Sequence, residues 1–143
     1  MTVPFSATRM IPAGWSARHA AVLPTSFNAA VTIGTRQGDA TYDPGTDDTS
    51  AAYSVDHAGG ARIQHLTGTH PAELSGQHVT GMTYLVEVAA SCPAIPRGAR
   101  VLVTAAPNDP SPVGLALWVI ASARGSEMFT RSVFCSTAEA DSL

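Results

Sequence analysis

Apolar and polar residues alternate in several short runs along the second half of this chain. Between residues 81 and 89 (GMTYLVEVA), one face carries Met82, Tyr84, Val86 and Val88. Between residues 97 and 105 (RGARVLVTA), one face carries Ala99, Val101, Val103 and Ala105. Successive side chains of a β-strand point to opposite faces, so each run predicts a strand with one buried face.

Four further runs fit strands. Residues 26–35 (SFNAAVTIGT) place Phe27, Ala29, Val31 and Ile33 on one face, and residues 61–66 and 130–136 are short strand candidates. Residues 114–123 (GLALWVIASA) are apolar on both faces, which predicts a central strand covered on both sides. Trp118 is therefore expected in the core, with an interface as the second reading.

A helix is expected near the N-terminus. Pro12 and Pro24 bracket the segment AGWSARHAAVL, in which Trp15, His19, Val22 and Leu23 recur at helical spacing. Proline is tolerated in a first helical turn and ends a helix further on. We therefore predict a short amphipathic helix between the two prolines.

Residues 38–60 differ in character from the strands. They mix Asp, Gly, Pro, Ser and Thr, which favour turns, and they hold five acids and no base: Asp39, Asp43, Asp47, Asp48 and Asp56. We expect a long loop or arm with a strand at residues 51–55. Loops of this length in a compact domain are usually functional or disordered.

These elements indicate one all-β domain spanning residues 1–143. We predict a small antiparallel β-barrel or sandwich, with a helical segment at 1–24, a long turn-rich loop or arm at 38–60 and a barrel core at 61–136. A length of 143 residues is sufficient for one core.

Composition and charge restrict the function. Hydrophobic residues make up 45% of the chain, charged residues 13%, and the net charge is −3. Arg9, Arg18 and Arg36 give residues 1–38 a charge of +3 without any acid, but the arginines form no basic cluster anywhere in the chain. Binding to nucleic acid through phosphates is therefore not expected. The longest apolar run, residues 113–123, is too short for a spanning helix, and no signal peptide is apparent, so no membrane association is expected.

No metal site is expected. Four of the five histidines, His57, His65, His70 and His78, fall within 22 residues, but their spacing matches no metal motif, although His65 and His78 would meet if their strands were neighbours. His19 is the fifth. The stretch DPGTDD lacks the ligand spacing of an EF-hand and fits a solvated hairpin tip better. Cys92 and Cys135 are expected as buried, reduced thiols rather than as a bridge.

No catalytic or cofactor-binding residue stands out either. Neither cysteine neighbours a histidine, and no G-x-S-x-G motif or Gly-rich phosphate loop occurs. Glu73 and Glu87 are explained by a turn and an exposed strand face. We therefore expect no enzyme and no cofactor.

The order of turns and strands resembles the head-to-tail stoppers of long-tailed phages of actinobacteria, over roughly Tyr42 to Ser136. That family has a glycine-led strand, a Pro-x-Gly-x-x-Val strand and an Asp-Pro turn before Val-Gly. The matching residues here are Gly76, Pro96, Gly98, Val101, Asp109, Pro110, Val113 and Gly114.

The resemblance implies a structural protein of the virion neck, present in the host cytoplasm during assembly. It implies a six- or twelve-fold homo-oligomeric ring between the portal and adaptor complex and the tail terminator or tail tube, which helps to retain packaged DNA. DNA would pass through without sequence-specific binding. Within that picture, the segment Asp39–Asp56 would project toward the channel or a basic partner. The alternatives are a tail-terminator subunit of the same neck and a soluble β-barrel binding module.

Overall fold

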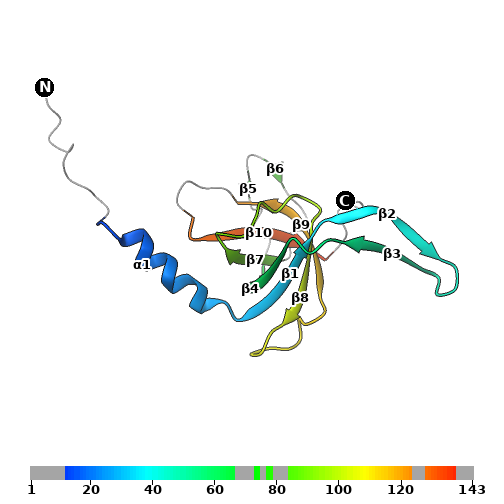
Figure 1. The fold of residues 1–143 in the computed structure, drawn as a ribbon, viewed down its shortest axis with the longest axis horizontal. Helices are drawn as coiled ribbons and strands as arrows, with labels where there is room; N and C mark the ends of the chain where they lie inside the picture. The colour runs from blue at the N-terminus through cyan, green and yellow to red at the C-terminus, as the bar shows by residue number, and fades with distance from the viewer. Residues whose placement is uncertain (1–11, 67–72, 75–76, 79–83, 124–127, 138–143) are drawn as a thin grey trace, which may run out of the picture.

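The computed structural model describes residues 12–66, 73–74, 77–78, 84–123 and 128–137. Its elements are α1 (Trp15–Val22), η1 (Leu23–Ser26), β1 (Ala29–Gly34), β2 (Arg36–Asp43), β3 (Asp48–Tyr53), β4 (His57–His65), β5 (Glu73–Leu74), β6 (Gln77–His78), β7 (Tyr84–Ala89), β8 (Arg100–Ala105), β9 (Ala116–Ser122) and β10 (Thr130–Ser136). Figure 1 shows them along the chain.

Six strands close into an antiparallel barrel in the order β1-β4-β7-β10-β9-β8. Closure comes from β1, which pairs with β4 on one side and with β8 on the other. The predicted fold class, a small all-β barrel or sandwich with a short N-terminal helix, is confirmed. Of these two alternatives, the structure is a barrel. The barrel includes β1 and all of β4, so it begins well before residue 61, the predicted start of the core.

The barrel interior is filled by alternate residues of the six strands, as the sequence pattern predicted. The side chains with at most 2% of their surface exposed include Val31, Ile33, Val86, Val88, Val101, Val103, Leu117, Val119, Val133 and Cys135. β-branched side chains dominate this set, because they pack well on a pleated surface. Removing their apolar surface from water is the main stabilising contribution, at roughly 25 cal/mol per Å².

One residue of the predicted inner face points elsewhere. Ala105 is exposed, while Ala106 is buried at 8% exposure. The cause is a register shift: Ala30 pairs with Ala105, but Val31 pairs with Val103, so Thr104 is an extra residue on β8. A bulge of this kind interrupts the two-residue alternation, and the inner face resumes at Ala106.

Helix α1 lies between the two prolines as predicted and ends at Val22, and Pro24 lies in the following 3-10 turn. Its predicted apolar face, however, is covered only in part, because Trp15 is half-buried whereas His19 and Val22 are exposed. None of its residues is buried, and Val22 is 64% exposed. The helix lies at one end of the molecule (Figure 1).

The turn-rich segment is a β-hairpin and not a loop. β2 and β3 pair with each other, and residues 44–47 form the turn between Asp43 and Asp48. The predicted strand at 51–55 corresponds to β3 at 48–53, and β4 already begins at His57. We call residues 36–53 the arm. This segment is ordered although it is rich in turn-forming residues, because its backbone groups are paired across the hairpin.

Candidate functional site

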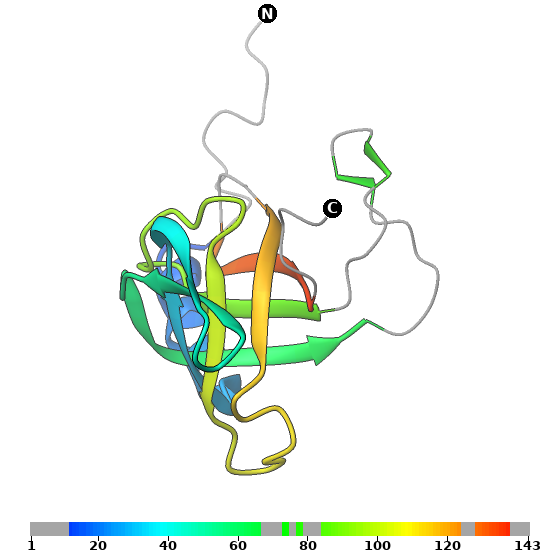
Figure 2. The same cartoon turned by 90° about the vertical axis from the view of Figure 1, so that its right-hand side faces the viewer.

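The arm projects from the barrel at the end opposite to α1 (Figure 1). Figure 2 views the molecule from the arm side, with the arm in front of the barrel. β2 and β3 form a separate two-stranded sheet, and every residue from 41 to 50 is exposed. An isolated two-stranded ribbon is marginally stable in water, so contacts at the base of the arm are needed to keep it ordered.

The two faces of the arm differ. Residues paired directly across the hairpin share a face, so Tyr42 lies beside Thr49 on the face that also holds Tyr53. Asp43 and Asp48 pair on the other face. Tyr42 is 56% exposed, so much of its ring is available for contact with a partner.

The tip of the arm is ordered by its own acids. The Tyr42 hydroxyl donates to Asp47 Oδ1 at 2.6 Å, and the Gly45 amide donates to Asp43 Oδ1 at 2.8 Å. The bond to Asp47 raises the pKa of the Tyr42 phenol, with a smaller contribution from burial. Asp47 itself has a left-handed backbone, with φ at 52°. The tip therefore presents a tyrosine ring and carboxylates in a defined arrangement.

The base of the arm is held by three polar side chains. The hydroxyl groups of Thr35 and Ser54 are 3.0 Å apart, and Asp56 accepts from both, at 3.2 Å from Thr35 and 2.8 Å from Ser54. Backbone bonds from Ser54 to Thr35 and from Asp56 to Ile33 join the same residues. This network connects the two chains of the hairpin where they leave the barrel, so it sets the direction of the arm.

An aromatic contact fixes the arm to the outer wall of the barrel. Trp118 on β9 donates its Nε1–H to the Tyr53 hydroxyl at 3.3 Å, and the Arg100 guanidinium lies 4.0 Å above the centre of the Tyr53 ring. Trp118 is thus half-buried on the outer face, and the prediction that it lies in the core was wrong. The base of the arm thus covers one of the apolar residues on the outer face of β9.

Replacing Tyr53 with Phe is expected to destabilise the protein by about 1 kcal/mol, because Trp118 loses an acceptor while the ring stays beneath Arg100. Tyr53→Leu also removes the cation–π contact and is expected to cost roughly a further 0.5–1 kcal/mol. Urea unfolding measures both differences, and hydrogen exchange reports whether the arm amides open. Equal stability of the two variants would show that the ring contact contributes nothing.

Of the five predicted site residues, the arm carries four: Asp39, Asp43, Asp47 and Asp48. All four are exposed, which fits a solvated hairpin tip. Asp56 is separate from them, because it belongs to the network at the base of the arm. Within the described ranges, no group of three or more His, Cys, Asp or Glu side chains is placed to hold a metal ion.

The helix end carries an aromatic cluster. The Trp15 ring lies 4.1 Å from that of His19 and 5.4 Å from that of Phe129, in the segment before β10. His19 Nδ1 is also 2.9 Å from the Trp15 carbonyl oxygen. These contacts attach one side of α1 to the barrel. Arg18 and Val22 remain exposed.

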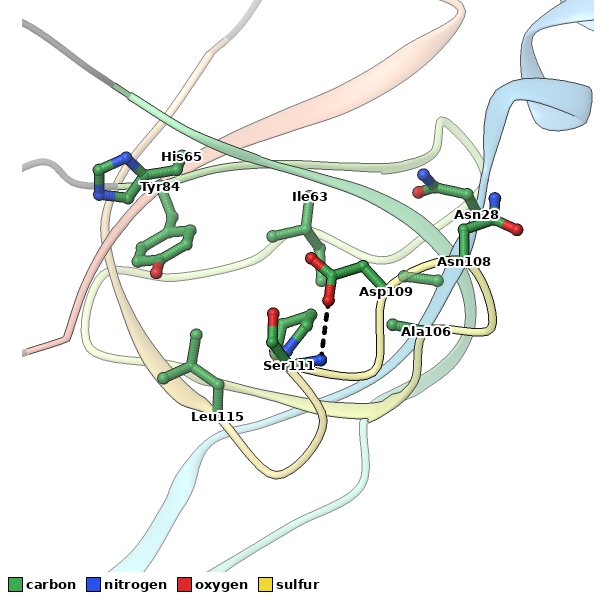
Figure 3. Close-up of a pocket in the computed structure, with 11 residues that line it drawn as sticks. Asn28, Ile63, His65, Tyr84, Ala106, Asn108, Asp109, Ser111 and Leu115 are labelled. Atoms are coloured by element: carbon green, nitrogen blue, oxygen red, sulfur yellow. Dashed lines mark hydrogen bonds between the residues drawn. The ribbon is translucent and has the colours of Figure 1, made fainter.

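A pocket of about 400 Å³ lies at one end of the barrel (Figure 3). Ile63, Tyr84 and Leu115, which pack against the core, provide its apolar lining. Polar residues include Asn28, His65, Asn108, Asp109 and Ser111. The Ser111 backbone amide donates to Asp109 Oδ1 at 3.0 Å, and this bond, with that of the Ser111 hydroxyl, lowers the pKa of Asp109. No sequence pattern predicts this pocket, because its residues come from segments far apart in the chain.

The remaining sequence candidates are dispersed. His65 stacks edge-on against Tyr84 at 5.1 Å between ring centres, and His57 begins β4. Glu87 Oε2 lies 3.4 Å from Arg62 Nη1, and the two side chains form an ion pair on the outside of the barrel. His70 and the side chains of Glu73 and His78 lie outside the described residues, so the proximity of His65 and His78 stays a prediction. Among the described helices, none has the length and apolar character needed to cross a membrane.

Both cysteines are buried and free, as predicted. Burial raises the pKa of Cys135 from 9.0 to about 12, and burial also raises the pKa of Cys92, where Arg131 partly offsets it. With a pKa near 12, roughly one Cys135 thiol in ten thousand is ionised at pH 8.

We expect both thiols to react slowly with a disulfide reagent in the native protein and at once in denaturant, because the thiolate is the reactive form. The folded state retains the Cys135 proton that the unfolded state loses above pH 9, so stability is expected to fall as the pH rises from 9.0 toward 12. Absorbance of the released thiol and urea midpoints across this range measure the two effects. Equal reaction rates for native and denatured protein would contradict the burial of both side chains.

The fold and its exposed features define a small closed β-barrel with a projecting hairpin arm. The family model described as a family of unknown function (DUF6093) matches residues 19–136, so the chain belongs to this family. No curated protein matches the chain. Among solved structures, it is similar to protein SF1141 from Shigella flexneri 2a, with a TM-score of 0.55 and 17% identity, over 80% of this chain and 94% of that chain. At this identity the likeness concerns the fold alone.

Proposed function

We propose that this chain is a structural subunit of a phage neck, a head-to-tail stopper that forms a ring between the portal and adaptor complex and the tail. The observation that carries the proposal is the exposed arm, which is ordered at its tip and rigidly held at its base. A ring subunit must reach its neighbours, and a projecting hairpin with an apolar face provides such a reach.

The glycine and valine residues on which the resemblance to the stopper family rests have clear roles in the barrel, and these roles support the proposal. Gly98 and Gly114 have φ angles of 83° and 85° in the turns on either side of β8. Their amides donate to the Val119 and Val103 carbonyls, at 2.8 Å in each case. Val101 lies between them with no exposed surface. The motif therefore encodes the turns that frame one strand of the barrel, as expected of a family that shares a barrel architecture.

The charge distribution is compatible with a ring through which DNA passes. The net charge is −3, and the four acids of the arm repel phosphate. Under this proposal the protein acts without a cofactor or catalytic step, and its location is the virion neck after assembly in the host cytoplasm.

The test is electron microscopy of lysates from a phage in which the gene for this chain, or for another member of its family, is disrupted. Free tails beside tailless, partly emptied heads are expected, because a stopper retains DNA and joins the tail. Normal infectious particles would overturn the proposal. Full heads without tails, or tails of irregular length, would assign the chain to the tail terminator instead.

The pocket favours a second candidate, a soluble binding module. Its apolar lining and polar rim are typical of small-molecule sites. A Leu115→Trp substitution would fill the pocket, and its effect on virion assembly distinguishes the neck subunit from the binding module. The variant should leave virion assembly unchanged if the chain is a neck subunit. Loss of assembly in a variant that still folds would make the pocket part of the function.

A further inference from the structure

We propose that the arm of one copy docks onto α1 of a second copy, in a head-to-tail contact. This contact would be the interface between neighbouring subunits of the proposed ring, so the inference rests on the proposed function. The contact joins two exposed patches of opposite charge, each with a large apolar side chain. One lies at the tip of the arm and the other on α1.

The arm patch consists of Tyr42 and Asp47 at the tip of the hairpin. Tyr42 is 56% exposed and its hydroxyl is bonded to Asp47, which places an apolar ring directly beside a carboxylate. Asp43 and Asp48 pair across the hairpin on the opposite face, and both are exposed. They lie outside the patch, but they add to the negative charge of the tip that faces a cationic partner.

The helix patch consists of Arg18 and Val22. These residues are four apart in α1, so they are neighbours on one side of the helix. Both are exposed, and Val22 at 64% is among the most exposed large apolar side chains described. The helix segment WSARHAAV contains no acid. An arginine beside an exposed valine thus complements a carboxylate beside an exposed tyrosine.

Two arginines of the barrel already have partners, whereas Arg97 is exposed in the turn before β8. Arg62 lies 3.4 Å from Glu87, and Arg100 lies over the Tyr53 ring. Arg18 has an exposed valine one helical turn away, and a guanidinium can bind a carboxylate through two parallel hydrogen bonds. Arginine and tyrosine are also enriched in protein interfaces.

The positions of the two patches determine the type of assembly. The arm and α1 lie at opposite ends of the molecule (Figure 1), so an arm cannot reach the helix of its own chain. Each copy would offer an arm to one neighbour and a helix to another. A heterologous contact of this kind closes into a ring when its rotation permits.

Cysteine cross-linking tests the contact in the full chain. Val22→Cys on the helix and Thr49→Cys beside Tyr42 on the arm are expected to give a ladder of disulfide-linked oligomers on mild oxidation at high protein concentration. Cys92 and Cys135 are buried and contribute little. The matched control combines Val22→Cys with Ala105→Cys, an exposed residue on β8, and should give no ladder beyond a dimer.

Charge reversal within the cross-linking pair tests the complementarity. Arg18→Glu or Asp47→Arg alone should reduce the yield of the ladder by up to about fivefold, and the two together should restore it. Equal yields in the control pair, or no rescue by the double reversal, would overturn the proposal. A ladder combined with normal particles after gene disruption would keep the contact and reject the neck role. A neck phenotype without any ladder would assign the arm to another partner and overturn the contact.

Discussion

Val101→Asp is expected to destabilise the barrel by about 4–5 kcal/mol, which removes much of the stability of a domain of this size. Val101 has no exposed surface and lies on β8 opposite Ile33 of β1 and Leu117 of β9. A carboxylate placed there would be surrounded by apolar side chains and would have to take up a proton or expose the core to water. Thermal and urea unfolding measure the loss.

Ala105→Asp is the control for this variant. Ala105 is on the same strand, but the bulge at Thr104 leaves it exposed. A new carboxylate at this position remains in water, so the free energy of unfolding should change by less than about 0.5 kcal/mol. Similar losses in the two variants would mean that the inner face of β8 has been assigned incorrectly.

Gly34→Ala is expected to cost about 3 kcal/mol and to loosen the base of the arm. A Cβ built on Gly34 would overlap the carbonyl oxygen of Ser54, and a backbone atom cannot move aside as a flexible side chain would. The strand would have to separate from Ser54, which belongs to the network with Thr35 and Asp56. Faster hydrogen exchange in the arm should accompany the loss of stability.

Gly60→Ala provides a matched comparison, because Gly60 is also a strand glycine of the barrel. A Cβ at Gly60 would lie 3.5 Å from Phe27, an ordinary van der Waals distance. We expect a change within about 1 kcal/mol in either direction, since alanine also restricts the unfolded chain. If both glycines tolerate alanine equally, the close approach of Ser54 is not what requires glycine at residue 34.

The inner faces of the barrel strands could be predicted from the sequence because alternation is a local property. The pattern placed Val86, Val88, Val101 and Val103 correctly. It failed at Ala105, because a bulge depends on how the partner strand pairs and not on the residues of one strand. A sequence pattern alone does not contain that information.

The arm and the pocket were harder to predict for different reasons. Residues 38–60 are rich in turn formers, and their pairing as a hairpin depends on the Asp43–Asp48 turn and the anchoring of Tyr53 by Trp118, which lies 65 residues further along the chain. The sequence predicts the acids of the arm, but it does not distinguish Asp56, which stabilises the base, from the other four. The pocket combines Asn28, His65 and Asp109, and no local signal links them.

The way the arm leaves the barrel has a mechanical consequence. β2 and β3 continue β1 and β4, which are neighbours in the barrel and pair at Ile33 and His57 near that exit. A force on the arm is therefore divided between β1 and β4. On the side away from each other, β1 pairs with β8 and β4 pairs with β7, through five residue pairs in each case. Because those hydrogen bonds run across the strands, a load along the strands acts on many bonds together instead of opening them one at a time. The hairpin can thus carry tension without unzipping the wall that supports it.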